Sequence, residues 1–166
     1  MLELVTSMKQ LDVRQLIRVH AESIYTQRGK YNCDTSDNLQ QLRAEQDFYD
    51  YLTAFFGEYG GVYALWVSAG RYCSALRLEP YNDGYLLSGL ETPREARRKG
   101  YANALIRSVL QYVSHNGGTK LYSHVDKNNA ASLALHEGCG FRRILEHAVY
   151  VDGSVYHSSC TLCYEP

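Results

Sequence analysis

The segment that most constrains the fold is residues 97–102 (R-R-K-G-Y-A), which stand between an apolar, strand-like run and a helix-like one. The apolar residues after it follow the three- and four-residue spacing of a helix with one buried face: Leu105, Ile106, Val109, Leu110 and Val113. The small residues Gly100 and Ala102 allow a ligand to approach the backbone, and the start of a helix offers free N–H groups. Together with the basic side chains, this pattern predicts a cradle for a diphosphate.

Composition points to one globular domain over residues 1–166. The chain has 166 residues, of which 45% are hydrophobic and 21% are charged, as is usual for soluble globular proteins. Its formal net charge is −1, whereas a protein that binds nucleic acid through its bulk charge usually carries a basic excess. We therefore expect no nucleic-acid partner.

Neither the N-terminal residues nor the cysteines favour export. The first residues lack the basic and then apolar order of a signal peptide, and no apolar run approaches the roughly 20 residues that span a bilayer. Five scattered cysteines indicate free thiols in a reducing compartment. His157, Cys160 and Cys163 would alternate between the two faces of a strand, so they cannot meet at one ion. We expect a cytoplasmic protein without a membrane segment or a metal.

The periodicity of apolar residues predicts eleven elements. Strands are expected at 2–6, 62–69, 71–80, 85–92, 120–125, 141–151 and 155–164, and helices at 9–25, 38–57, 100–115 and 129–137. The polar stretch at 26–37 is expected to be a loop, and Asp152-Gly153 a hairpin turn. The buried stripe of the second helix is predicted to consist of Leu39, Leu42, Tyr49, Leu52 and Phe56.

The order of these elements also predicts how the sheet is connected. The first four strands suit an antiparallel set, and 85–92, the helix at 100–115 and 120–125 suit a right-handed crossover between two parallel strands. Ligands in open sheets bind beyond the carboxyl ends of strands, where helices begin. The predicted cradle lies at such a point.

The number of glycines in residues 97–102 narrows the choice of phosphate ligand. The segment has only one glycine, which excludes the P-loop and the three-glycine dinucleotide fingerprint. Basic residues before a single glycine suit a diphosphate with an additional charge, and coenzyme A has both a diphosphate and a 3′-phosphate. The R-x-x-G-x-A pattern alone is weak evidence, because about one chain in seven of this length would contain such a pattern by chance.

A second motif follows, with the pattern N-x-x-S-x-x-L-H-x-x-x-G-F over residues 129–141. With this motif the chain resembles the GNAT (Gcn5-related N-acetyltransferase) superfamily, whose signatures are [Q/R]-x-x-G-x-[G/A] and N-x-x-[A/S]-x-x-L-Y-x-x-x-G-F. The resemblance is strong over residues 85–142. It implies an α/β (α+β) fold, in which about four helices flank a mixed, mostly antiparallel sheet of six to seven strands with a central, splayed parallel pair.

The resemblance implies an N-acetyltransferase that uses acetyl-CoA as co-substrate, with direct attack of an amine on the thioester. The backbone edge at 90–92 would hold the pantetheine arm, and the amides of 97–102 the diphosphate. The residues implied in cofactor binding are Leu90, Glu91, Thr92, Arg97, Arg98, Lys99, Gly100, Tyr101, Ala102, Asn129, Ser132 and His136. Asn129 can also cap the helix that follows it.

The chain departs from the family pattern at the catalytic acid, because His136 stands where the family usually has tyrosine. His136 can be the acid that protonates the leaving thiolate, a spacer beside the sulfur with water as acid, or a sign of weakened activity. For the base, His124 and Glu91 are the candidates, and ordered water can replace both. Cys139 is expected to pack as a small hydrophobic residue rather than act as a nucleophile.

The acceptor site is the least defined part of the sequence. The family implies that the loop after the first helix and the last hairpin shape it, and Tyr25, Tyr31, Tyr150 and Tyr156 in these segments would suit a cationic amine. These tyrosines can equally be ordinary core and surface residues. A small-molecule amine, a peptide N-terminus and a protein lysine remain open, as do a longer acyl donor, a non-catalytic acyl-CoA-binding module, and a monomer or homodimer.

Overall fold

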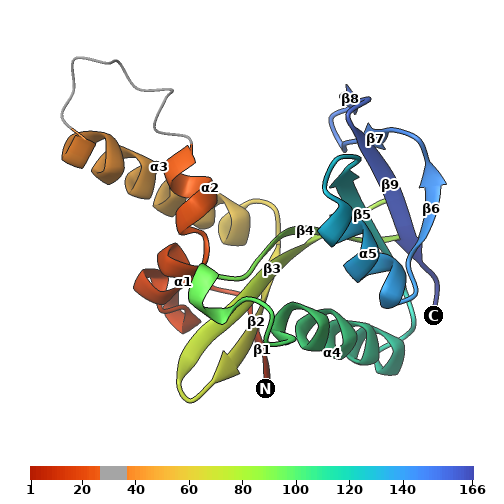
Figure 1. Ribbon diagram of the computed structural model, residues 1–166, viewed down its shortest axis with the longest axis horizontal. Helices are drawn as coiled ribbons and strands as arrows, with labels where there is room; N and C mark the ends of the chain where they lie inside the picture. Colours follow the sequence, from red (N-terminus) through yellow and green to blue (C-terminus); the bar gives the residue numbers. More distant parts are fainter. Residues whose placement is uncertain (27–36) are drawn as a thin grey trace.

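The computed structural model describes residues 1–26 and 37–166, and its centre is a twisted sheet with helices on both faces (Figure 1). In the described chain, seven strands form this sheet in the order β1-β2-β3-β4-β5-β9-β6. Their bounds are β1 (Leu2–Val5), β2 (Val62–Ser68), β3 (Arg71–Tyr81), β4 (Gly84–Glu91), β5 (Lys120–Asp126), β6 (Arg142–Leu145) and β9 (Ser159–Tyr164). A separate hairpin consists of β7 (Ala148–Val149) and β8 (Val155–Tyr156).

The helices lie on opposite faces of the sheet. Their bounds are α1 (Val13–Val19), α2 (Ala21–Thr26), α3 (Asp37–Gly57), α4 (Tyr101–His115) and α5 (Ala130–Gly138), with short 3-10 turns η1 (Met8–Gln10) and η3 (Arg94–Ala96). On one face, Leu105 and Ile106 of α4 pack in the largest core cluster together with Leu87 of β4. On the other face, Leu52 and Phe55 of α3 lie in a second cluster with α1 and β2. None of these described helices is long and apolar enough to span a membrane.

The predicted parallel pair is confirmed, and it is short. β4 and β5 pair in parallel from Gly84 opposite Lys120 to Leu87 opposite Ser123, while the neighbouring strand pairs are antiparallel. Beyond Leu87, β4 continues to Glu91 without β5, and β5 turns away with β9 as its partner. Figure 1 shows the two strands diverging toward the helices α2 and α5. The divergence leaves one backbone edge of β4 open, as the mixed, splayed sheet predicts.

A bulge lies in β4 beside this open edge. The register between β3 and β4 shifts between Ala75 and Arg77, and Gly89 in the bulge has φ of +58°. A Cβ at Gly89 would approach the guanidinium of Arg77 to 2.6 Å. Glycine is therefore required here both for the left-handed backbone and for the space that Arg77 occupies.

The single helix predicted at 9–25 is wrong, because the segment forms η1, α1 and α2. Asp12 accepts a hydrogen bond from the backbone N–H of Gln15 at 3.1 Å, so α1 begins as a capped helix at Val13. His20, with φ of −92° and ψ of 13°, separates α1 from α2. The interruption carries the buried ring of His20 toward the sheet.

The buried stripe predicted for α3 is also largely wrong. Leu39, Leu42 and Tyr49 are exposed, whereas Leu52 is buried and Phe56 packs against the core, as predicted. Together with Leu52, the face toward the sheet is formed by small and aromatic residues at helical spacing, namely Ala44, Phe48, Tyr51 and Phe55. The helix carries two interleaved apolar stripes, and only its tertiary contacts decide which one is buried.

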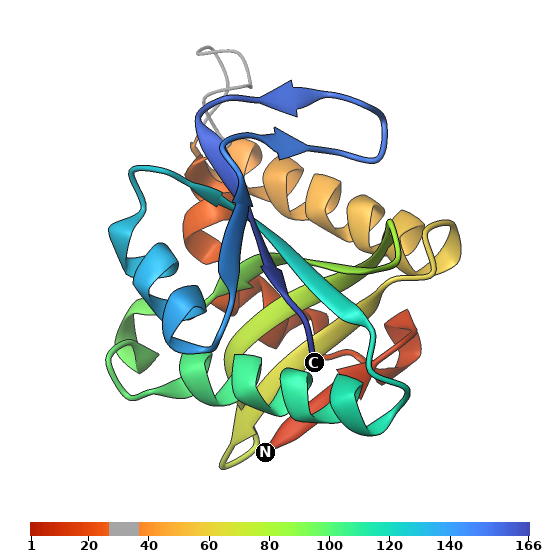
Figure 2. The same cartoon turned by 90° about the vertical axis from the view of Figure 1, so that its right-hand side faces the viewer.

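The C-terminal segments are divided more finely than the periodicity predicts. Residues 141–151 form β6 and β7, and residues 155–164 form β8 and β9, which belong to two different sheets. The hairpin of β7 and β8 projects from one end of the main sheet (Figure 2). The hydroxyl of Tyr81 donates to the carbonyl of Val149 and ties this hairpin to β3. The predicted turn at 152–153 is confirmed, with Gly153 at φ of +81°.

Candidate functional site

A series of pockets lies between the start of α4 and the layer formed by α2 and α3. One of about 240 Å³ lies over Gly100 and Ala102, and the next, of about 310 Å³, follows the end of β4. A third, of about 210 Å³, lies in the gap between β4 and β5. The fourth is a cavity of about 360 Å³ below α3. Glu91 lines the last three, so it stands where they meet.

The predicted cradle has the backbone that a diphosphate needs. Gly100 caps α4 with φ of +80°, and no side chain caps the helix. Arg98 also has a left-handed backbone, with φ of +61°. Because the first turn of a helix has N–H groups without helical partners, and Ala102 adds little bulk, the hollow over this turn suits an anion.

Ion pairs connect the basic residues beside the cradle to α2. The carboxylate of Glu22 accepts hydrogen bonds from both Arg94 and Arg97, and these bonds lower the pKa of Glu22. Arg97 also donates from Nε to the carbonyl of Thr92 at 2.9 Å. Lys99 donates to the carbonyl of Glu95 at 2.8 Å. The pairs with Glu22 are exposed, so they cost little to rearrange when a phosphate approaches.

The gap between β4 and β5 is closed on one side by the start of α5. Asn129 accepts a hydrogen bond from the N–H of Ser132 at 3.0 Å, which confirms that it caps this helix. Leu90 and Glu91 of β4 line the same hollow as Asn129 and Ser132. Arg97 and Ala102 line one of these hollows as well, so residues of the two sequence motifs face one another across the open edge of β4.

His136 is buried at the bottom of this gap and is held by two hydrogen bonds. Its Nδ1 donates to the carbonyl of Ser132 at 2.8 Å, because a carbonyl can only accept. Its Nε2 lies 3.1 Å from the hydroxyl of Ser123. Burial lowers the pKa of His136, and the bond to Ser132 offsets only part of that effect. At neutral pH the ring is therefore uncharged, and Nε2 accepts the proton of Ser123.

Acidification is expected to destabilise the protein through His136. The unfolded state has the ordinary histidine pKa of about 6.5 and the folded state a lower one, so below pH 6.5 the unfolded state binds more protons. The free energy of unfolding should fall by at most about 1.4 kcal/mol per pH unit from this group between pH 6.5 and its folded pKa. Urea unfolding at pH 7.5 and pH 5.5 should show a smaller loss in His136→Phe than in the wild type. His115→Gln, which removes an exposed histidine, is the control, and equal losses in all three proteins would contradict the assignment.

His124 lies on β5, on the opposite face from Ser123. Its ring stands edge-on to Tyr81 and Tyr150, with centroids 5.5 and 4.7 Å away. Both ring nitrogens are buried, and neither has a hydrogen-bond partner among the residues that the structure describes. Burial lowers the pKa of His124, so the ring is neutral and able to accept a proton at neutral pH.

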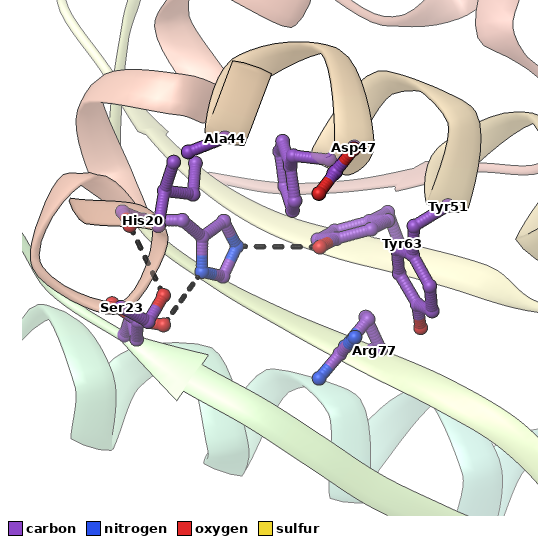
Figure 3. A pocket seen from close by; sticks show the side chains of 10 residues that line it. His20, Ser23, Ala44, Asp47, Tyr51, Tyr63 and Arg77 are labelled. Carbon is purple, nitrogen blue, oxygen red and sulfur yellow. Dashed lines mark hydrogen bonds and ion pairs between the residues drawn. The ribbon is translucent and has the colours of Figure 1, made fainter. Parts of the chain in front are cut away.

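Glu91 is the end of a chain of three polar groups, and Figure 3 shows the other two, His20 and Tyr63. Its Oε1 accepts from Nδ1 of His20 at 2.9 Å, and Nε2 of His20 lies 3.3 Å from the hydroxyl of Tyr63. Burial alone would raise the pKa of Glu91, but the interaction with His20, the hydrogen bond from Ser23 and, last, the charge of Arg77 outweigh it and hold the pKa below its usual value. Glu91 is therefore an ionised carboxylate that faces three hollows.

The cavity below α3 contains residues that the sequence did not single out. Besides Glu91, it is lined by polar and aromatic side chains from α2, α3, β2 and β3 and from the break before α2: His20, Ser23, Asp47, Phe48, Tyr51, Tyr63 and Arg77. His20 carried a recognisable signal, because it lies four residues after Leu16 and four before Ile24 on the apolar side of the segment. The others come from separate elements and show no local pattern.

The three described tyrosines that were predicted to bind the acceptor lie in two separate places, Tyr25 on α2 and the other two on the C-terminal hairpin. The hydroxyl of Tyr25 donates to Glu45 at 2.9 Å, and Tyr25 lines a separate hollow beside Arg94. Tyr150 and Tyr156 lie on the hairpin of β7 and β8, with ring centroids 5.3 Å apart. Tyr31 lies outside the described residues. Their role in acceptor binding stays a prediction.

The cysteines match the expectation of unpaired thiols. The described cysteines are free, and Cys139 is buried among apolar residues, where burial raises its pKa. Such a thiol is a poor nucleophile. Within residues 1–26 and 37–166, no group of three or more His, Cys, Asp or Glu side chains could hold a metal ion.

Comparison with known proteins agrees with this geometry. The sequence profile of the acetyltransferase (GNAT) family matches residues 24–141. An uncharacterized N-acetyltransferase, YobR of Bacillus subtilis (strain 168), is 35% identical over 66 residues, which cover 39% of this chain and 27% of YobR. The chain thus matches only about a quarter of the length of that relative.

Solved structures share the whole fold. PaiA N-acetyltransferase from Thermoplasma acidophilum, determined in complex with coenzyme A, superimposes with a TM-score of 0.66 at 14% identity, over 100% of this chain and 99% of that one. The ribosomal-protein-S18-alanine N-acetyltransferase from Escherichia coli gives a TM-score of 0.61 at 16% identity, over 99% of this chain and 94% of that one. With the profile match over most of its length and this common fold, the chain belongs to the acetyltransferase (GNAT) family.

Proposed function

We propose that the chain is an N-acetyltransferase that transfers the acetyl group of acetyl-CoA to a primary amine. The observation that carries the proposal is the position of Glu91, where the open edge of β4 meets the cavity below α3. A donor lying along β4 would reach this point from one side and an acceptor in the cavity from the other. The similarity of the fold to solved N-acetyltransferases also supports this proposal.

The residues present fit acetyl-CoA. The first turn of α4 offers N–H groups to a diphosphate, and Arg97 and Arg98 line the hollow over this turn. The unpaired edge of β4 offers peptide groups to the amides of a pantetheine arm, as an added strand would use them. Bound there, acetyl-CoA supplies an activated acyl group in the gap between β4 and β5.

Glu91 is the base in this proposal. The amine must lose a proton before it attacks, and an ionised carboxylate facing the cavity can accept that proton directly or through one water. His20 orients Glu91 through the 2.9 Å hydrogen bond, and Nε2 of His20 in turn lies 3.3 Å from the hydroxyl of Tyr63. His124, neutral and without a partner among the described residues, lines the gap as the second candidate.

His136 acts here as a positioning residue. Because burial keeps the imidazole neutral, an imidazolium that protonates the thiolate is disfavoured at neutral pH. The ring instead fixes the hydroxyl of Ser123, and both groups line the gap where the sulfur would lie. This arrangement favours the spacer interpretation, with water supplying the proton.

We also propose which acceptor and partners take part in the reaction. The acceptor is an amine on a small molecule or a peptide, and neither nucleic acid nor a membrane takes part. We also propose a cytoplasmic location and a monomer or homodimer.

The test is release of free thiol from acetyl-CoA in the presence of a broad panel of amines. We expect release above the hydrolysis blank for at least one class of amine, together with calorimetric binding of coenzyme A. Propionyl-CoA and butyryl-CoA in the same assay determine the preferred acyl length. Tight binding of coenzyme A without release for any amine would overturn the proposal in favour of a non-catalytic acyl-CoA-binding module.

A further inference from the structure

Arg77 brings a positive charge into the cavity below α3. It lies on β3, and its guanidinium points into the cavity beside Tyr51 and Tyr63 (Figure 3). The guanidinium carbon stands 5.0 Å from the centre of the Tyr51 ring, within cation-π distance. The missing side chain of Gly89 makes room for this conformation, since a Cβ there would collide with the guanidinium.

The charge of Arg77 is incompletely matched by the protein. In the part of the chain that the structure describes, Arg77 forms no ion pair, and its buried Nε has no hydrogen-bond partner. The hydroxyl of Tyr51 offers the guanidinium one neutral acceptor, but a guanidinium only donates, and a buried N–H group without an acceptor costs free energy. This cost is reduced if a ligand in the cavity supplies the acceptor.

The nearby carboxylates are engaged elsewhere. Glu91 accepts from His20 at 2.9 Å, and Glu79 accepts from the hydroxyl of Ser88 at 2.9 Å. Both influence Arg77 electrostatically, but neither is close enough to form an ion pair with it. The cavity therefore presents two carboxylates, of Glu91 and Asp47, and one guanidinium, and Glu91 and Arg77 lie separately on the same face of neighbouring strands.

We propose that the acceptor is a zwitterion of the amino-acid type, whose carboxylate binds Arg77 while its amine faces Glu91. A guanidinium and a carboxylate match as two parallel N–H···O bonds, which fixes the orientation of the ligand as well as its charge. The register places Ala75 opposite Glu91, and Arg77 is two residues further along the same face of β3. This spacing of about 7 Å along the strand suits a compact molecule with both groups a few bonds apart.

The inference rests on the proposed function in one respect, namely that the bound amine is acetylated. The carboxylate site can be tested separately. Acceptors are compared in matched pairs, each an α-amino acid and its carboxamide, by thiol release and by calorimetry with coenzyme A present. The proteins are the wild type, Arg77→Gln, Arg77→Lys and Arg71→Gln, which removes an exposed arginine from the same strand.

We expect the wild type and Arg71→Gln to prefer the amino acid, and Arg77→Gln to lose about 30-fold or more in kcat/KM for it. The carboxamide should change little, and Arg77→Lys should recover part of the loss because it keeps the charge without the planar fork. Equal use of both members of each pair by the wild type overturns the inference and leaves the acetyltransferase intact. If no amine is turned over, the proposed function fails, and calorimetry still decides: binding of amino acids that Arg77→Gln abolishes supports the site, and absence of binding overturns it.

Discussion

Glu91→Gln is expected to lower kcat by about 100-fold or more, while the affinity for coenzyme A changes less than about twofold. General bases contribute roughly this factor, and glutamine keeps the shape of the side chain without its proton affinity. The affinity for coenzyme A should persist because the cradle at α4 is made of backbone N–H groups, and glutamine leaves the backbone edge of β4 unchanged.

The pH profile makes this prediction specific. An amine loses its own proton as the pH approaches its pKa, about 10 for an alkylamine, so the defect of Glu91→Gln should shrink as the pH rises. His20→Gln should give a smaller loss, because it removes only the group that orients Glu91. Glu58→Gln, an exposed residue just after α3, serves as control. A Glu91→Gln enzyme with unchanged kcat at pH 7 would leave His124 or water as the base.

Ala102→Glu is expected to weaken binding of coenzyme A by about 100-fold without weakening the fold. Ala102 lines the hollow over the first turn of α4, so glutamate there would place a carboxylate where the diphosphate binds. Like charges in such contact cost several kcal/mol. A negative charge at a helix N-terminus is otherwise favourable by about 0.3–1 kcal/mol, so the unfolding temperature should stay the same or rise.

Ala102→Gln is the matched control, because it has the same size without the charge. We expect a clearly smaller loss of affinity in calorimetry, and the difference between the two variants measures the charge alone. Equal losses would mean that bulk, rather than repulsion of phosphate, explains the effect. Unchanged affinity in both variants would place the diphosphate elsewhere.

The part of the site that the sequence predicted depends on local rules. A glycine with φ of +80° before a long helix, and an asparagine cap before a shorter one, leave recognisable residues in the sequence. The parallel pair followed from a strand-helix-strand order with right-handed connection. These features require only neighbours along the chain, so the cradle and the start of α5 could be predicted.

The cavity below α3 could not be predicted, because it depends on contacts between distant segments. His20 reaches Glu91 across 71 positions, and Arg77 enters the cavity through a bulge that only the register of β3 and β4 reveals. The break at His20 interrupts a pattern that the periodicity treats as one helix. For the same reason the periodicity does not predict which stripe of α3 is buried.

The position of β9 between β5 and β6 has a consequence for folding order. β6 precedes β9 in the chain, yet it joins the sheet only through β9, with Arg142 opposite Cys163. During synthesis β6 therefore has no partner strand in this sheet until β9 has emerged and paired with β5. Such late, non-local pairing slows folding and leaves a strand edge open to other chains in the meantime. The side of the gap between β4 and β5 that is formed by β5 and α5 should therefore be the last region to become stable.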